Sequence, residues 1–196
     1  MIELKDKRII LASNSPRRKQ LLSLMDIPFI CAMSDNKEVI CEDITPYEAV
    51  ADLAKQKSDA IMKNIDDNDI VITADTIVLL NNQILVKPID KTAEKEMLQA
   101  LSGASHEVVS GVCIADKRYQ DTFYDVTKVK FSQLSEDDIE YYISRYNPID
   151  KAGAYGIQEW IGAIGIEKIE GSYYNVMGLP TEKLYAHLKS FLKHYE

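Results

Sequence analysis

The chain has no excess of positive charge, few cysteines and no long apolar segment, and each absence excludes a class of protein. Its formal net charge is −8, which argues against a nucleic-acid-binding protein with a basic surface. Its three cysteines, Cys31, Cys41 and Cys113, are odd in number and lack metal-ligand spacing, so we expect small buried side chains. No apolar segment is long enough to span a bilayer, and we expect no membrane contact.

Two further absences concern the start of the chain and its glycine motifs. Residues 1–8 are charged and lack the apolar segment of a signal peptide, so we expect a protein of the reducing cytoplasm. Neither the P-loop pattern GxxxxGKS/T nor the dinucleotide-binding pattern GxGxxG occurs. A nucleotide would therefore have to be bound by another arrangement.

Strand and helix patterns alternate along the 196 residues, of which 46% are hydrophobic, enough for one domain or two small lobes. Strands are predicted at 8–12, 70–80, 83–86, 107–115 and 122–131, and helices start near residues 15, 45, 92, 135 and 181. Several strand pairs are hairpins, which favours a mixed α/β sheet. Six of the eight glycines lie between residues 153 and 178, where we expect tight turns and short strands. In the last helix, Leu184, Leu188 and Leu192 are expected to face inward.

Two arginines follow a helix-start signal that comes directly after the first strand. Ser15 is a good N-cap and Pro16 suits the first helical position, so Arg17 and Arg18 fall in the first turn. The helix dipole disfavours cations there and favours anions. Strand, tight turn and basic helix start together indicate a phosphate-binding segment. The alternative is two solvated surface arginines.

A lysine lies on the apolar side of the second predicted helix. This helix begins with a capping box at Thr45, and its apolar stripe includes Val50, Leu53 and Ala54 before it meets Lys57. Lys57 either extends along the apolar surface to solvent or reaches an anion.

A carboxylate interrupts the most apolar strand of the chain. Asp75 lies inside the strand 70–80, where an unpaired carboxylate is costly to desolvate. It is either a metal ligand or a general base, unless a local turn lets it bond to nearby backbone. Lys87 ends the returning hairpin strand and is expected near the Asp75 end of the sheet.

Two more side chains complete a chemical inventory. Glu38 lies in a polar loop before the second helix, where a solvated acid is the alternative. Gln158 ends the glycine-containing segment 150–158 and offers both a donor and an acceptor, which suits reading a base edge. The alternative is a surface glutamine. The basic side chains suit phosphates and the carboxylates suit a cation. Together they are the side chains expected of a site that binds a nucleoside triphosphate with Mg²⁺.

The chain resembles the Maf family of nucleotide pyrophosphatases over nearly its whole length. The motifs that carry the resemblance are Leu11-Ala12-Ser13 to Arg18, Leu53-Ala54 with Lys57, Ala74-Asp75-Thr76-Ile77-Val78, Lys87-Pro88, Leu101-Ser102-Gly103 with His106, Asp150 to Gln158, Gly171-Ser172-Tyr173 and Gly178-Leu179-Pro180. One departure is Thr73, where the family usually has glycine.

The resemblance implies hydrolysis of a nucleoside triphosphate between its α and β phosphates, which releases a nucleoside monophosphate and pyrophosphate. Asp75 is then the proton acceptor that activates a water, and Lys57 and Lys87 are catalytic with it. A divalent metal, Mg²⁺ or Mn²⁺, is the implied cofactor, with Asp75 and Glu38 as its ligands.

The resemblance also implies which side chains bind the substrate. Arg17, Thr76 and Gln158 match the branch of the family that acts on dTTP and UTP, and Ser13 and Arg18 are predicted to bind substrate with them. A modified pyrimidine triphosphate is compatible with the same residues.

The family fold is similar to that of inosine triphosphate pyrophosphatases. It implies one Maf-like domain over residues 1–196, with an elongated mixed sheet flanked by helices and a cleft between two lobes. Family members are often dimers, so a homodimer is compatible with the resemblance. The competing hypothesis is a regulator of cell division that binds nucleotide without turnover. The presence of Asp75, Lys57 and Lys87 favours the enzyme.

Overall fold

A computed structural model describes residues 2–33, 39 and 43–195, and the chain divides into two compact units. The first unit comprises Met1–Asp75, Ser110–Asp125 and Gly178–Glu196. The second comprises Thr76–Val109 and Val126–Met177. Each unit is described on its own below.

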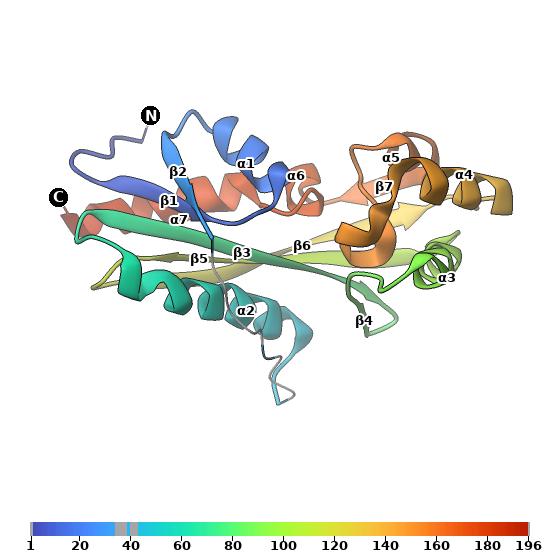
Figure 1. The fold of residues 1–196 in the computed structure, drawn as a ribbon, viewed down its shortest axis with the longest axis horizontal. Helices are drawn as coiled ribbons and strands as arrows, with labels where there is room; N and C mark the ends of the chain where they lie inside the picture. Colours follow the sequence, from blue (N-terminus) through green and yellow to red (C-terminus); the bar gives the residue numbers. More distant parts are fainter. Residues whose placement is uncertain (1, 34–38, 40–42, 196) are drawn as a thin grey trace. The chain divides into compact units, whose positions relative to one another are not determined.

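The strands form a mixed sheet, as predicted (Figure 1). They are β1 (Arg8–Ala12), β2 (Phe29–Ala32), β3 (Asp69–Leu80), β4 (Gln83–Leu85), β5 (Ser105–Ala115), β6 (Gln120–Phe131) and β7 (Ile166–Glu170). Their order is β2-β1-β3-β5-β6-β7, and β4 pairs with β3. β1 is parallel to β2 and to β3. β4 is antiparallel to β3, and β7 is antiparallel to β6. The predicted α/β class with a mixed sheet and flanking helices is confirmed.

The helices are α1 (Pro16–Ser23), α2 (Pro46–Ile61), α3 (Lys91–Leu101), α4 (Glu136–Tyr146), α5 (Trp160–Gly165), α6 (Tyr173–Val176) and α7 (Thr181–Leu192), with 3₁₀ turns η1 (Met62–Asn64), η2 (Pro148–Asp150), η3 (Ala152–Ala154) and η4 (Lys193–Tyr195). Three of them, α1, α2 and α4, begin directly after the capping residues that the sequence indicates. Ser15 caps α1, and Thr45 forms the expected capping box with Glu48 at the start of α2. No helix in the described part of the chain is both long and apolar enough to cross a membrane.

In the first unit, α2 and α7 lie on opposite faces of the strands (Figure 1). His187 of α7 contacts two residues of β6: its Nδ1 lies 2.8 Å from the Asp121 carboxylate, and its ring stacks on Phe123. The next residue, Tyr124, stacks instead on Tyr47 in the first turn of α2. Successive strand residues point to opposite faces, so this alternation assigns one helix to each face.

In the second unit, α3 packs against α4 and η3. His106 of β5 is buried there, with Nε2 2.8 Å from the Tyr155 hydroxyl and its ring stacked on Phe131. Burial lowers the pKa of His106 to about 4, so this histidine is neutral at pH 7 and acts as a packing residue.

The glycine-rich last quarter differs from the prediction of short strands. Only β7 is a strand among the described residues from 148 to 180, and η2, η3, α5 and α6 account for the other regular elements. The final helix also differs at one position, because Phe191 is buried and Leu192 is only half-buried. Phe191 is seven residues after Leu184, which places both on the same helix face.

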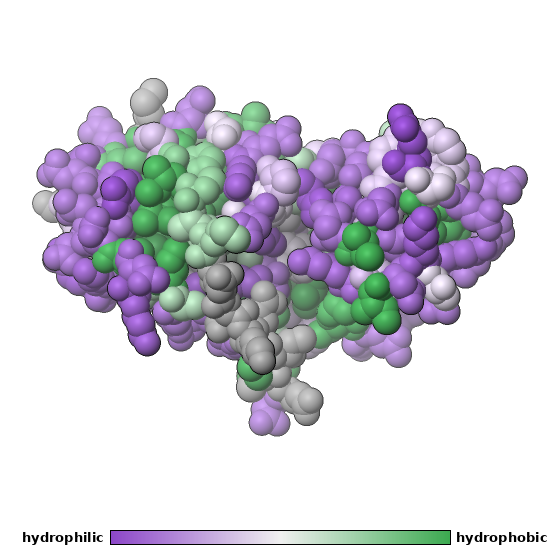
Figure 2. All heavy atoms as spheres, viewed as in Figure 1, coloured by the Kyte–Doolittle hydropathy of each residue, from purple (hydrophilic) through white to green (hydrophobic). Residues whose placement is uncertain are grey.

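One strand and the burial of one cysteine also differ from the sequence-based prediction. β2 has no counterpart among the predicted strands, and its middle residues, Ile30 and Cys31, are exposed rather than buried. The prediction of a buried Cys31 is therefore wrong, whereas Cys113 is buried as expected and Cys41 lies outside the described residues. Figure 2 shows apolar surface where β2 lies in Figure 1.

Glu94 of α3 is a fully buried carboxylate in the second unit. Among the described residues, neither of its oxygens has a hydrogen-bond partner. Desolvation raises its pKa above the ordinary 4.5. The folded protein therefore holds this proton to a higher pH than the unfolded chain does, and Glu94 lowers stability as pH rises from about 4.5 through the raised value.

Glu94→Gln should remove this pH-dependent loss of stability. We expect the variant to match the parent near pH 4 and to be more stable than it at pH 7, because a neutral amide avoids the cost of desolvating an ionised carboxylate. Urea unfolding at a series of pH values measures the difference. Glu96→Gln, at an exposed position of the same helix, is the matched control. Parallel pH profiles for the parent and Glu94→Gln would contradict the assignment.

Candidate active site

The structure brings Lys57 and Asp75 together within the first unit. Lys57 projects from α2, and its Nζ lies 3.0 Å from Oδ1 of Asp75 on β3. The two side chains are only 16% and 19% exposed. Lys57 therefore reaches an anion, the Asp75 carboxylate, instead of extending to solvent. Asp75 lies inside an unbroken strand, so the alternative of a local turn is wrong.

Thr73 sets the position of α2 relative to this pair. Its buried hydroxyl donates a 2.6 Å hydrogen bond to the carbonyl oxygen of Ala54. Thr73 and Asp75 lie on the same side of β3, while Ala54 and Lys57 are three residues apart on one side of α2. The sequence marked Thr73 only as a departure from glycine, and the structure shows that its hydroxyl ties strand to helix beside the ion pair.

The basic segment after β1 has the local structure that the sequence predicts. The Ser13 hydroxyl accepts a hydrogen bond from the backbone N–H of Ser15 at 3.2 Å, and the Ser15 hydroxyl accepts one from that of Arg18. Arg17 and Arg18 are both half-buried in the first turn of α1. Nε of Arg18 donates to the Gly178 carbonyl oxygen at 2.8 Å, so this guanidinium also holds the chain entering α7.

The parallel pairing of β1 and β3 puts this basic segment after the strand that neighbours the ion pair. Leu11 is paired with Ile72, and β1 ends one residue later at Ala12, whereas β3 continues through Asp75. In parallel α/β sheets, ligands bind beyond the carboxyl ends of strands. Ser13 and the arginine-bearing start of α1 follow such a strand end, and the neighbouring strand β3 carries Asp75.

Three other predicted site residues belong to the second unit. Thr76 follows Asp75 on β3 and is half-buried, Lys87 follows β4 and is exposed, and Gln158 is exposed just before α5. Residues 153–157 are all buried, so Gln158 is the first exposed residue after this buried run. The expectation that Lys87 approaches Asp75 stays a prediction.

Sequence reasoning missed the buried lysine of the same segment. The Lys151 side chain is 8% exposed and pairs with Asp150 at 2.7 Å and with Glu159 at 3.3 Å. The available signal was its place in a run of small and apolar residues, where a charged side chain needs partners.

Of the two predicted metal ligands, Asp75 lies among the described residues. Glu38 lies outside the described residues, and within the described part of the chain no three His, Cys, Asp or Glu side chains are grouped to bind a metal ion. Asp75 supplies one carboxylate beside the basic segment. This donor set fits Mg²⁺, which proteins often bind through one or two carboxylates together with substrate phosphates.

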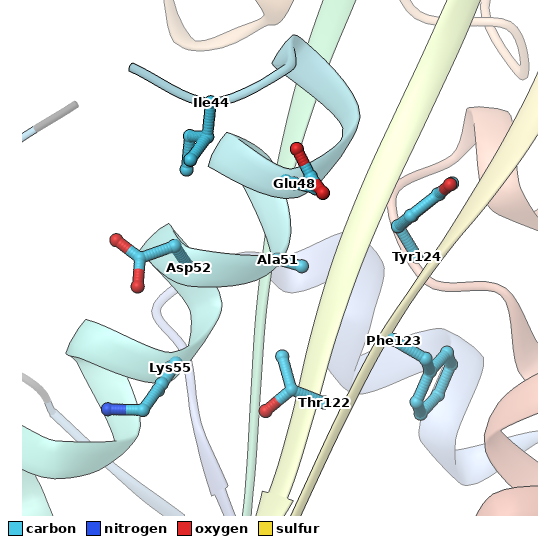
Figure 3. A pocket seen from close by; sticks show the side chains of 8 residues that line it. All are labelled: Ile44, Glu48, Ala51, Asp52, Lys55, Thr122, Phe123 and Tyr124. Carbon is cyan, nitrogen blue, oxygen red and sulfur yellow. The ribbon is translucent and has the colours of Figure 1, made fainter. Parts of the chain in front are cut away.

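A surface pocket of the first unit lies between α2 and β6 (Figure 3). Its lining residues are Ile44, Glu48, Ala51, Asp52, Lys55, Thr122, Phe123 and Tyr124. No predicted site residue is among them, so this pocket is distinct from the Lys57–Asp75 pair.

Comparison with known proteins finds similar sequences that match nearly the whole chain. The sequence profile of the family described as Maf-like protein matches residues 8–191. The chain is 47% identical over 191 residues to the dTTP/UTP pyrophosphatase of Porphyromonas gingivalis, covering 96% of each chain. It is 45% identical over 183 residues to the protein of the same name from Bacteroides thetaiotaomicron, covering 93% of this chain and 95% of that one.

A solved structure supports the fold. The Ham1 protein of Staphylococcus aureus aligns with 97% of this chain and 100% of its own, with a TM-score of 0.50 and 16% sequence identity. At this identity the likeness concerns the fold alone. The family profile and the high identity to curated relatives confirm the resemblance found in the motifs, and the chain belongs to the Maf-like family.

Proposed function

We propose that this protein hydrolyses dTTP and UTP, together with modified pyrimidine nucleoside triphosphates, to the nucleoside monophosphate and pyrophosphate. Such an activity would remove unwanted nucleotides from the cellular pool. The observation that carries the proposal is the Lys57–Asp75 pair, in which Asp75 lies on the strand next to the one that leads into the Ser13–Arg18 segment. In the proposal, Asp75 is the general base and this segment binds phosphate, and both belong to the first unit. The names of the relatives, dTTP/UTP pyrophosphatase, support this substrate class.

In the proposed reaction, Asp75 accepts a proton from the water that attacks one phosphorus of the α,β-anhydride, and the bridging P–O bond breaks to release the nucleoside monophosphate and pyrophosphate. Lys57, 3.0 Å away, orients this carboxylate and adds positive charge close to the phosphates. Arg17, Arg18 and Ser13 bind phosphate oxygens, since guanidinium groups suit paired oxygens of this kind.

The remaining predicted residues have distinct roles in the proposal. Lys87 contributes further positive charge to catalysis, and Thr76 and Gln158 select the base. Asp75 and Glu38 would hold Mg²⁺ or Mn²⁺, which would neutralise phosphate charge. The acidic net charge of −8 supports a small-molecule substrate over nucleic acid. A cytoplasmic homodimer without membrane contact completes the proposal.

A pyrophosphate-release screen of the purified protein tests this function. The substrates are dTTP, UTP, CTP, ATP, GTP and 7-methyl-GTP, each with Mg²⁺ or Mn²⁺. We expect turnover of dTTP and UTP and much less of purine nucleotides. Preferential turnover of a guanine nucleotide would contradict the substrate class but keep the reaction. Nucleotide binding without any turnover would favour a regulator instead.

A further inference from the structure

The hydrogen bond that joins Thr73 to the backbone of α2 lies within one helical turn of Lys57. Its oxygen–oxygen distance is 2.6 Å, and Thr73 and Ala54 are both 0% exposed. Because water does not reach this bond, it is stronger than the same bond would be in water. Thr73 lies two residues before Asp75 on β3, and Ala54 lies three residues before Lys57 on α2. The strand and the helix are therefore joined twice, by this hydrogen bond and by the ion pair.

Neither partner gives up a backbone hydrogen bond to form this contact. Ala54 lies inside α2, where its carbonyl oxygen accepts the regular helical hydrogen bond and keeps a second lone pair for Thr73. Threonine is branched at Cβ and its χ1 angle is restricted, so the backbone of β3 sets the direction of the hydroxyl. The bond therefore fixes a defined point of α2 against a defined point of β3.

The packing of α2 on the neighbouring strand β5 does a different task. A Cβ on Gly111 would lie 2.2 Å from the carbonyl oxygen of Val50, so the backbone of α2 rests directly on β5. Such a contact limits how closely the helix approaches the sheet, but it has no preferred direction along the strands, unlike a hydrogen bond. The bond from Thr73 thus supplies the directional part of the attachment.

Lys57 depends on this attachment because its own side chain is flexible. Lysine carries its ammonium group on a four-carbon stem, so the position of Nζ depends on where the helix backbone places Cα. The distance of 3.0 Å from Nζ to Oδ1 of Asp75 is already at the long end for a charge-assisted hydrogen bond. An outward shift of α2 by about 1 Å would carry Nζ beyond hydrogen-bonding distance. The contact between Lys57 and Asp75 therefore requires α2 to stay where Thr73 holds it.

We propose that Thr73 is a positioning residue for hydrolysis, whose hydroxyl holds α2 so that Lys57 can orient the Asp75 carboxylate. This inference rests on the proposed function, in which Asp75 is the general base. All four residues that make the two contacts belong to the first unit. The phosphate-binding segment follows β1 and not α2, so the role of Thr73 concerns kcat and not the binding of the triphosphate.

The test begins with Thr73→Val and Thr73→Ser, assayed for pyrophosphate release from dTTP with Mg²⁺ or Mn²⁺. In Thr73→Val, a methyl group in the place of the hydroxyl would lie 2.6 Å from the Ala54 carbonyl oxygen, where carbon–oxygen contacts are normally about 3.3–3.6 Å. We expect α2 to move outward and kcat to fall about 10–100-fold with KM unchanged, since a misplacement of about 1 Å can cost about 100-fold. Thr73→Ser keeps the hydroxyl and should retain most of the parent's kcat.

A double-mutant cycle shows whether Thr73 acts through Lys57. Lys57→Met should itself lower kcat, and adding Thr73→Val to it should lower kcat little further, because the group that Thr73 positions is already absent. Ser58→Ala is the matched control. It removes a fully buried hydroxyl next to Lys57 that has no bond to β3 among the described residues, and it should leave kcat unchanged.

The outcomes separate this inference from the proposed function. If the parent releases no pyrophosphate from dTTP or UTP, the proposed function fails and this inference fails with it. With an active parent, a Thr73→Val variant that keeps the parent's kcat, or that raises KM alone, overturns only the positioning role. The same holds if Thr73→Ser is as slow as Thr73→Val, or if Thr73→Val lowers kcat by the same factor with and without Lys57.

Discussion

Asp75→Asn is expected to lower the kcat for pyrophosphate release from dTTP and UTP by about 10²–10⁴-fold, the usual contribution of a positioned general base. The substitution keeps the size of the side chain and an oxygen that can accept a hydrogen bond from Nζ of Lys57, now 3.0 Å from Oδ1. The carboxylate that would take the proton of water is lost. Steady-state kinetics with saturating metal measure kcat, and thermal unfolding checks that the fold is intact.

Asp69→Asn is the matched control on the same strand. Asp69 is 2% exposed and accepts a 2.7 Å hydrogen bond from Nε of Arg8. The hydrogen bond from Arg8 holds the pKa of this carboxyl below its ordinary value of 3.8. The ionised Asp69 therefore stabilises the fold at pH values above 3.8, and this stabilisation is lost as the pH falls through the lowered pKa. We expect Asp69→Asn to lower the unfolding temperature at pH 7 and leave kcat unchanged. If Asp75→Asn behaves in the same way, Asp75 is structural and the proposed mechanism is wrong.

The sequence marked Lys57 and Asp75 of the first unit as candidate catalytic side chains, but it did not predict that they pair. Helical periodicity placed Lys57 on the packed side of its helix, and apolar neighbours marked Asp75 as costly to bury. Their pairing depends on how α2 lies across β3, which the buried hydrogen bond from Thr73 fixes. The same limit applies to Arg18, whose Nε bonds to Gly178, 160 residues away. The local sequence pattern indicates which charged side chains lie in unusual positions. Tertiary packing determines which residues they contact.

Elements with a strong local signal were predicted well, and weak ones were not. Serine or threonine before proline located the starts of α1 and α2 because capping is determined within one turn. β2 was missed because its four residues show no alternation, with the two middle ones exposed. In the last quarter, clustered glycines predicted turns correctly but not short helices. A positive φ of 68° at Gly153, for example, lies inside the 3₁₀ turn η3.

Gly111→Ala is expected to destabilise the first unit by about 3 kcal/mol or more, at the upper end of the cost of overpacking. A Cβ at this position of β5 would lie 2.2 Å from the carbonyl oxygen of Val50 and 2.6 Å from the backbone nitrogen of Ala51. Both atoms belong to the backbone of α2, so a rotamer change cannot relieve the overlap. A glycine inside a strand pattern is a known sign of close backbone approach, and this one was overlooked. Urea unfolding measures the loss.

Because α2 also carries Lys57, moving the helix should lower kcat as well as stability. Cys113→Ala is the matched control, since Cys113 lies two residues along the same strand and packs under Ala54 of α2. Removing its sulfur should cost only about 1 kcal/mol, as for other small core deletions, and leave Lys57 in place. Adding one carbon at residue 111 should therefore be more harmful than removing one sulfur at residue 113. The opposite ranking would mean that α2 can shift away from β5 at little cost, and that the position of Lys57 opposite Asp75 does not depend on this contact.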